Sequence, residues 1–567
     1  MVATGALSAV RPGELSDAHA QEALPPPRSQ ANSPEITAGG VVPLTEENVA
    51  RPLRYTPEDG GFSIHNGKEF FNRPLYGPNI PFRVDGGDLP EFSLYLPGHG
   101  GNLRLGLLTQ DGRESKWLHE CESVAMRWID GRLHYEIRDA VLGADGKLEL
   151  EALAAGAALW VQLTASNISR GVELVWAFGG VSGRKGKRNG DIGCEDEPVS
   201  QFFQLRPEEC RGNRWTLSDG VKQSSAEVQA DKMRISVACS LTTQWALGEA
   251  DQWNNGWSAM WQGAKKEPEL PVLLGRTRVQ DEPIYLSVTV LAGAVLPSKQ
   301  GPQINATSKS FNVRRSELTA VARRVQWKTP DPFFNSMAGA LGIASDAIWD
   351  EAQGCVMHGG VAWRIALAGW RGPYCLDALG DHERMRRHVR HWIARQNTTS
   401  VMNGSGGEPT EKGFAGVEEA KGAPDPGSHL ARTENLLHSS GDLSHNHYDM
   451  NLVFFDAVLR HLRWTGDAGF AREVWPALQL HAAWERRLFR RLYGDKKDLP
   501  LYEAYAAIWA SDNLQYNGGG AAHSSAYNVF LNRGMAELAK KLGEPAAVAA
   551  AYNAEADAIV RAMRDQL

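Results

Sequence analysis

Short apolar runs alternate with turn residues between about residue 50 and residue 310. In 92-FSLYLPG-98, 133-LHYEIRD-139 and 284-IYLSVTVLAG-293 the apolar side chains recur at every second position, which is the period of a β-strand with one buried face. Asp-Gly pairs separate several of these runs and favour tight hairpin turns between them; they stand at 111–112, 130–131 and 145–146. This half of the chain is therefore predicted to form a large antiparallel β-sandwich.

From about residue 331 the apolar spacing becomes helical. Asp331 and Pro332 suit an N-cap followed by proline at the first helical position. Six helices are expected, over about 331–351, 377–396, 447–464, 468–493, 524–542 and 545–566. Taken two by two, they would form three antiparallel helical hairpins.

The change of period divides the chain into four predicted segments. Residues 1–48 are rich in Pro, Ala, Ser and Glu and are expected to be a disordered leader. The β-sandwich domain would cover 49–312, a linker 313–330, and a helical domain 331–567.

Composition and charge exclude several classes of function. The chain has 567 residues and a formal net charge of −7, so nothing favours binding to nucleic acid or to an anionic membrane. No apolar run is long enough for a transmembrane helix, and the N-terminus lacks a clear secretory signal.

The six cysteines are scattered and contain no C-x-x-C pair, so they form neither a disulfide framework nor a zinc pattern. A bridge between Cys194 and Cys210, or between Cys355 and Cys375, is compatible with the sequence but cannot be deduced from it.

The stretch 501-LYEAYAAIWASDNLQYNGGGAAHSS-525 combines acids with aromatic rings and ends in three glycines. It has neither a helical nor a strand period. Aromatic faces stack on the C–H faces of sugars, and carboxyl groups perform proton transfer. The stretch is therefore the leading candidate for a functional loop.

Three segments of the second half resemble the six-hairpin glycosidases, whose catalytic domain is an (α/α)6 barrel behind an N-terminal β-sandwich. They are 369-GWRGPYCLDALGDHER-384, 446-NHYDMNLVFFDAVLRHLRWTGD-467 and 502-YEAYAAIWASDNLQYNGGGAAHSSAYN-528. The strand half is similar to a domain of uncharacterised type found with such barrels. The resemblance implies that 331–567 is the catalytic domain. With about three hairpins in place of six, the resemblance implies a partial (α/α)6 toroid and a chain that is incomplete at its C-terminus.

The same resemblance implies a glycoside hydrolase that acts on a plant or microbial polysaccharide or oligosaccharide, with inversion, without a cofactor, in the periplasm or outside the cell. Such hydrolysis needs one protonated and one ionised carboxyl group, about 6.5–9.5 Å apart in inverting enzymes. Glu503, between Tyr502 and Tyr505, is the candidate general acid, and Asp512 or Asp449 the candidate base. The alternatives are structural: Glu503 as a buried acid bonded to backbone, Asp512 as a turn residue and Asp449 as a helix cap.

Residues that could bind sugar hydroxyls or stack on sugar rings are spread over several loops. Trp257, in 251-DQWNNGWSAMWQG-263, could stack on a sugar or equally pack in the core. The complete predicted set for substrate binding is Trp509, Tyr516, Asn517, Tyr505, Arg371, Trp370, His447, Glu434 and Trp257.

Two further hypotheses stay open at this point. A polysaccharide lyase on a related helical toroid would use a base such as Tyr448 or His447, with Arg371 neutralising a uronate. A non-catalytic glycan-binding protein would need neither acid nor base. The pattern H-x-H-x-D at 445–449 suggests a metal, but alternate residues share a face only on a strand and this segment enters a helix, so no metal site is predicted. The expected partner is a carbohydrate, and the oligomeric state is open.

Overall fold

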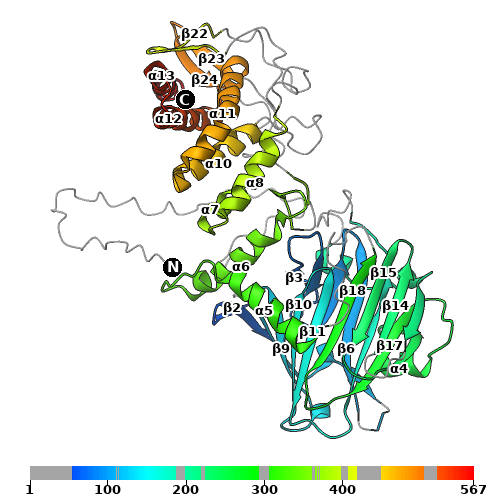
Figure 1. The fold of residues 1–567 in the computed structure, drawn as a ribbon. Helices are drawn as coiled ribbons and strands as arrows, with labels where there is room; N and C mark the ends of the chain where they lie inside the picture. The colour runs from blue at the N-terminus through cyan, green and yellow to red at the C-terminus, as the bar shows by residue number, and fades with distance from the viewer. Residues whose placement is uncertain are drawn as a thin grey trace, which may run out of the picture. The chain divides into compact units, whose positions relative to one another are not determined.

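The structure, a computed structural model, describes residues 54–109, 111–112, 114–186, 198–218, 224–292, 306–360, 364–366, 368–369, 371–396, 406–417, 449–503 and 520–567. Figure 1 shows these residues coloured from the N-terminus to the C-terminus. The leader predicted for residues 1–48 lies outside them.

Two large antiparallel sheets occupy the first half of the described chain (Figure 1). The ten-stranded sheet has the order β1 (Thr56–Glu58), β2 (Gly61–His65), β8 (Ser123–Ile129), β9 (Arg132–Arg138), β10 (Lys147–Ala154), β11 (Ala158–Ser166), β18 (Ile284–Ala292), β15 (Met233–Cys239), β14 (Ser224–Ala230) and β13 (Arg214–Ser218). The eight-stranded sheet has the order β16 (Gln244–Glu249), β17 (Pro271–Arg278), β12 (Glu173–Val181), β6 (His99–Leu108), β5 (Glu91–Tyr95), β4 (Arg83–Gly86) and β3 (Arg73–Tyr76), with β7 (Ser115–Trp117) paired to β6.

The two sheets share one apolar core, called the strand core below. Leu105 of β6 and Leu174 of β12 come from one sheet, and Tyr135 of β9 and Val288 of β18 from the other, and all four are fully buried. The alternation read from the sequence is present in β9, where every second residue is buried. Inward-facing apolar positions of both sheets thus supply the core.

The Asp130–Gly131 pair forms the predicted hairpin turn between β8 and β9. Both residues have positive φ angles, of 51° and 71°, as a two-residue turn of the primed type requires. The carboxylate of Asp130 also accepts a hydrogen bond of 2.9 Å from Thr319 Oγ1. That threonine lies on a helix that the sequence did not predict.

This helix is α5 (Ser308–Ala322), which runs through much of the stretch expected to be a linker and packs against α6 (Pro332–Ala347). Phe311, Leu318 and Ala322 of α5 and Ile343 of α6 belong to the strand core. The first predicted helix, with its neighbour, therefore covers the strands.

Two short helices, α3 (Val199–Phe202) and α4 (Trp257–Gln262), lie in the strand half. The other described helices form a second core with short hairpins between them. The helices are α7 (Tyr374–Ala378), α8 (His382–Ile393), α10 (Asp449–Thr465), α11 (Ala468–Leu488), α12 (Ala522–Leu542) and α13 (Ala546–Gln566). The hairpins pair β19 (Trp349–Asp350) with β20 (Cys355–Val356), β21 (Glu408–Thr410) with β22 (Gly413–Ala415), and β23 (Arg490–Tyr493) with β24 (Leu499–Tyr502). The second core, called the helix core below, includes Trp349, Val389, Phe455, Leu478 and Met535.

The predicted fold class, a β-sandwich followed by a partial toroid of three helical hairpins, is wrong. The large antiparallel sheets come with a second half in which helices alternate with two-stranded hairpins, and α6 joins the strand core instead of opening a helical ring. In the helix core α12 packs against α10, α11 and α13. The domain boundaries stay a prediction.

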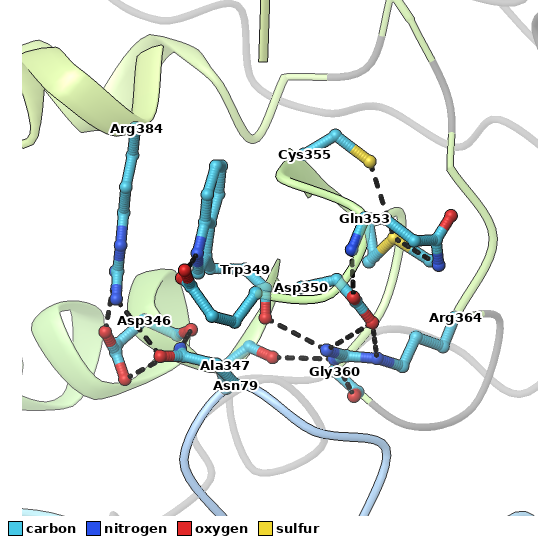
Figure 2. Close-up of polar contacts among 12 residues, drawn as sticks. Asn79, Asp346, Ala347, Trp349, Asp350, Gln353, Cys355, Gly360, Arg364 and Arg384 are labelled. Atoms are coloured by element: carbon cyan, nitrogen blue, oxygen red, sulfur yellow. Dashed lines mark hydrogen bonds and ion pairs between the residues drawn. The ribbon is translucent and has the colours of Figure 1, made fainter. Parts of the chain in front are cut away.

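Arginine side chains hold the end of α6 to its neighbours (Figure 2). Arg384 of α8 donates to Asp346 Oδ1 at 2.7 Å and to Asn79 Oδ1 at 3.1 Å, and Asn79 Nδ2 donates to the Asp346 carbonyl at 2.9 Å. Arg364 donates to the carbonyls of Ala347 and Trp349 at 3.0 and 2.9 Å, and lies 3.2 Å from Asp350 Oδ2. A loop between strands, the end of α6 and the helix core are thereby joined by polar contacts.

The cysteines in the described part of the chain are free thiols. Cys121, Cys210, Cys239 and Cys355 are buried and Cys375 is half-buried, so the bridge considered between Cys355 and Cys375 is absent. Cys210 is likewise free, and Cys194 lies outside the described residues. Among the described helices, none is both long enough and apolar enough to cross a bilayer.

Candidate functional site

Glu503 follows β24 directly and is held by backbone on both sides. Its N–H donates to the Phe489 carbonyl at 2.9 Å, and the residue forms an isolated bridge with Gly520. The next residue, Ala521, donates its N–H to the Tyr502 carbonyl at 2.9 Å. The side chain is only 8% exposed. Glu503 is therefore a buried carboxylate in a fixed position, at the point where the chain enters the acidic and aromatic segment.

The partner of this carboxylate is an arginine. Arg491 Nε lies 3.3 Å from Glu503 Oε2, and both side chains are at most 10% exposed. An adjacent guanidinium stabilises a carboxylate anion, whereas the predicted role as general acid needs the protonated form. The contact with Arg491 therefore suits a charged carboxylate at this position better than a general acid.

A second ion pair joins Arg490, one residue earlier on β23, to the buried Glu555 of α13. Arg490 Nε and Nη2 donate to the two oxygens of Glu555 at 2.7 and 3.1 Å, a bidentate geometry. The Tyr502 hydroxyl donates to Glu555 Oε1 at 2.9 Å. Burial, together with the neighbouring charge of Glu555, raises the pKa of Tyr502 well above its ordinary value. Tyr502 is thus a neutral donor that fixes β24 to α13.

The helix faces below β24 are also polar. Asn528 Nδ2 of α12 donates to Glu485 Oε2 of α11 at 3.1 Å, and Ser525 Oγ accepts from the Tyr502 N–H at 3.0 Å. Within the described residues, Asn528 Oδ1 and Asn532 Oδ1 are buried and have no hydrogen-bond partner. We call this group the Glu503 cluster; it comprises Glu485, Arg490, Arg491, Tyr502, Glu503, Ser525, Asn528, Asn532 and Glu555. It is a concentration of buried hydrogen-bonding groups around the start of the acidic and aromatic segment.

Two other predicted residues can be placed on the backbone. Asp449 is the first residue of α10, which is the position that both the capping and the catalytic hypotheses required. Arg371 is exposed and lies just before α7. Whether either residue acts together with Glu503 stays a prediction.

The other candidates of the acidic and aromatic segment and of the long loop lie outside the described residues. They are Asp512, Trp509, Tyr516, Asn517, Tyr505, Trp370, His447 and Glu434.

Trp257 is a core residue, so its packing explanation is the one that fits. Its side chain is 1% exposed, it stacks on Trp261 with ring centroids 4.7 Å apart, and Nε1 donates to the Trp176 carbonyl at 3.0 Å. A sugar would have no access to the indole face. The sequence could not reveal this, since a tryptophan beside asparagines is compatible with either environment.

Trp253, from the same stretch, lines a cavity of about 260 Å³ on the eight-stranded sheet. Arg104 lies in this cavity, 2.7 Å from Glu91 Oε2, with its guanidinium 4.7 Å from the centroid of the Trp253 ring. Burial and the charge of Arg104 lower the pKa of His119, another lining residue, to about 3. Because Arg104 already covers the tryptophan, the cavity offers polar groups more than an aromatic platform.

Two histidines and an aspartate form a group that the sequence analysis missed. Asp377, His382 and His461 each place one ligand atom within 4.8 Å of the others. They are separated by up to 84 residues and belong to three helices. The predicted helix over 377–396 contains two of them without a role for either, and no spacing rule connects them to His461.

Comparison with known proteins gives three results. The family model of a domain of unknown function (DUF4450) matches residues 96–294, which lie in the strand half. No curated protein matches the chain.

Among solved structures, the chain is similar to a bacterial glucoamylase complexed with acarbose, at 7% identity and a TM-score of 0.45, with 87% of this chain and 68% of that chain covered. It is also similar to a polysaccharide lyase at 8% identity and a TM-score of 0.19, with 87% and 82% covered. Because both TM-scores are below 0.5, neither similarity supports a conclusion about this chain.

Proposed function

We propose that the chain is a carbohydrate-active enzyme that hydrolyses a glycosidic bond, with Glu503 as an essential carboxylate. The observation that carries this proposal is the position of Glu503: buried, held by backbone on both sides, and 3.3 Å from Arg491. The residues that follow it combine carboxylates with aromatic rings, the side chains that cleave and stack on sugars.

In this proposal Glu503 acts as the ionised carboxylate. In an inverting reaction, that group activates the attacking water while the second carboxyl group protonates the leaving oxygen. The Arg491 guanidinium stabilises the anion that such a base needs. This reverses the role predicted from the sequence, where the flanking tyrosines suggested an apolar setting. With Glu503 as the base, we assign the acid role to Asp512, which the sequence analysis named as a candidate base and which lies outside the described residues.

The first prediction is that Glu503→Gln lowers kcat by about 10²–10⁴-fold, the usual contribution of a general base, with little change in KM. The amide keeps the shape and polarity of the side chain, so binding of the substrate is retained. Release of reducing ends from a panel of plant and microbial polysaccharides, followed by full kinetics on the best substrate, measures the effect.

Glu537→Gln is the matched control. Glu537 lies on α12 and forms an exposed ion pair with Arg463 at 3.0 Å, so its loss should leave kcat unchanged. Activity of Glu503→Gln within twofold of the unsubstituted chain would refute the role of Glu503. Products with an unsaturated uronate chromophore would identify a lyase. Glycan binding without turnover by the unsubstituted chain would identify a binding protein.

A further inference from the structure

Asp377, His382 and His461 converge from three helices of the helix core. Asp377 lies in α7, His382 is the first residue of α8, and His461 lies in α10. Asp377 Oδ1 is 2.8 Å from Nδ1 of His382 and 2.8 Å from Nδ1 of His461. Three side chains from different elements thus direct one donor atom each toward the same point.

The donor set has the chemistry of a site for a divalent cation of the zinc type. Two imidazole nitrogens and one carboxylate oxygen are the ligands that Zn²⁺ takes at about 2.0–2.2 Å, with a fourth position left to water. Tetrahedral ligation at such lengths separates donor atoms by about 3.3 Å, so the Asp377 oxygen needs to move about half an ångström away from each Nδ1 atom, 2.8 Å distant at present. Rotation of side chains at the surface end of the group can supply that.

Burial and charge also suit a cation. The side chains of His461 and Asp377 are 0% and 10% exposed, while that of His382 is 37% exposed, which leaves one side of the group open to solvent. With neutral imidazoles the group carries one negative charge. The Asp467 carboxylate adds a second negative charge close to His461, although Arg386 Nη1, 3.6 Å from Asp467 Oδ2, offsets part of it.

Hydrogen bonding alone leaves this arrangement incomplete. If both rings donate through Nδ1 to Asp377, the lone pair of His461 Nε2 stays buried without a partner among the described residues. Metal ligation through Nδ1 would instead place the ring proton on Nε2. Phe470 packs perpendicular to that imidazole, with centroids 5.4 Å apart, and an aromatic face can accept an N–H but not a lone pair.

We propose that Asp377, His382 and His461 form a Zn²⁺ site, with Nδ1 of both histidines and a carboxylate oxygen of Asp377 as ligands and an open position on the side of His382. The bound ion fastens α7 and α8 to α10. The proposal is independent of the glycosidase activity, since it rests on different residues and predicts metal binding without any substrate.

The test is titration of the full chain, freed of metal by a chelator, with Zn²⁺ alone in a calorimeter and with Co²⁺ in a visible-absorption experiment. We expect one Zn²⁺ per chain, a rise in the thermal midpoint on binding, and Co²⁺ ligand-field bands. Affinity should fall at least tenfold in His382→Gln and Asp377→Asn. His382 is the ligand of choice for substitution because it is the most exposed of the three, and circular dichroism verifies that the variant is folded.

His391→Gln is the matched control, because His391 lies on the same helix and its Nδ1 contacts only the Gln353 carbonyl at 3.0 Å in the described chain. Its Zn²⁺ affinity should equal that of the unsubstituted chain. The absence of Zn²⁺ binding, or binding that persists at full strength in His382→Gln, would overturn the proposal.

Discussion

Buried histidines couple the stability of the molecule to pH. Burial lowers the pKa of His388 and of His481 to about 3, and both side chains are fully buried in the helix core. Each remains neutral in the folded state while the unfolded chain takes up a proton near pH 6.5. This contribution to the free energy of unfolding is complete above that pH. As the pH falls from about 6 toward 3, each histidine lowers the free energy of unfolding by about 1.4 kcal/mol per pH unit.

The substitution His481→Phe should make the free energy of unfolding less dependent on pH. The His481 ring stacks on Phe455 with centroids 4.3 Å apart, and neither of its nitrogens has a partner within the described residues, so a phenyl ring can take its place. We expect similar unfolding free energies at pH 7 and an advantage of about 2 kcal/mol for the variant at pH 4.5. Urea denaturation at the two pH values measures it. If the unfolding free energy falls equally in the variant and in the unsubstituted chain between the two pH values, His481 is not a source of the pH dependence.

Single residues could be predicted where local chemistry determines them. Glu503 was found because it stands among aromatic residues, and it is a buried, fixed carboxylate. Its ion pair with Arg491 could not be foreseen, because Arg491 comes from the facing strand of a hairpin that the sequence did not reveal. The group of Asp377, His382 and His461 was missed because the contact between α7 and α10 is a tertiary property.

The helices and their ends agree more closely with the predictions from the sequence than the site residues do. Asp331 is the N-cap of α6, and its Oδ1 accepts from the N–H groups of Phe333 and Phe334 at 2.8 and 3.3 Å, as the Asp-Pro pair predicted. Gly543 ends α12 with a φ angle of 80°, which glycine adopts without strain. In contrast, α5 was missed because it buries only Phe311, Leu318 and Ala322, too few to produce a helical period.

Loss of this cap gives an element-scale prediction. Asp331→Ala should lower the free energy of unfolding by about 1 kcal/mol, because two N–H groups of the first turn lose their acceptor. Asp331→Asn is the control, since asparagine caps a helix as well as aspartate does. Chemical denaturation of both variants distinguishes them, and equal losses would show that charge, not capping, is responsible.

At the scale of the described molecule, polar contacts join the strand core to the helix core. The strand core includes α5 and part of α6, while α7, α8 and α10 to α13 form the helix core. The sequence period located most helices, but it could not tell which core each helix would join, because an apolar stripe fits any complementary face. This is why the expected toroid was wrong although its helices exist.

Arg384→Met should weaken the connection between the cores. The methionine keeps the apolar stem but removes the bonds to Asp346 and Asn79, at a cost of about 1–3 kcal/mol. In scanning calorimetry, we expect the unfolding transitions of the strand core and the helix core to lie further apart in temperature in this variant than in the unsubstituted chain. Arg386→Met on the same helix is the control, because Arg386 pairs with the exposed Glu383 at 2.9 Å and such pairs contribute little. An equal effect of both substitutions would argue against a connecting role for Arg384.

The buried free thiols can report transient opening of the folded structure around them. Burial raises the pKa of Cys210 to about 12 and that of Cys355 to about 11, so both are almost entirely in the unreactive thiol form at neutral pH. An alkylating reagent can therefore reach and modify them only when the surrounding structure opens. Cys210 lies beside the eight-stranded sheet and Cys355 in β20, next to the helices. The alkylation rates of Cys210 and Cys355 therefore measure local opening of the strand half and of the helical half separately, without any substitution.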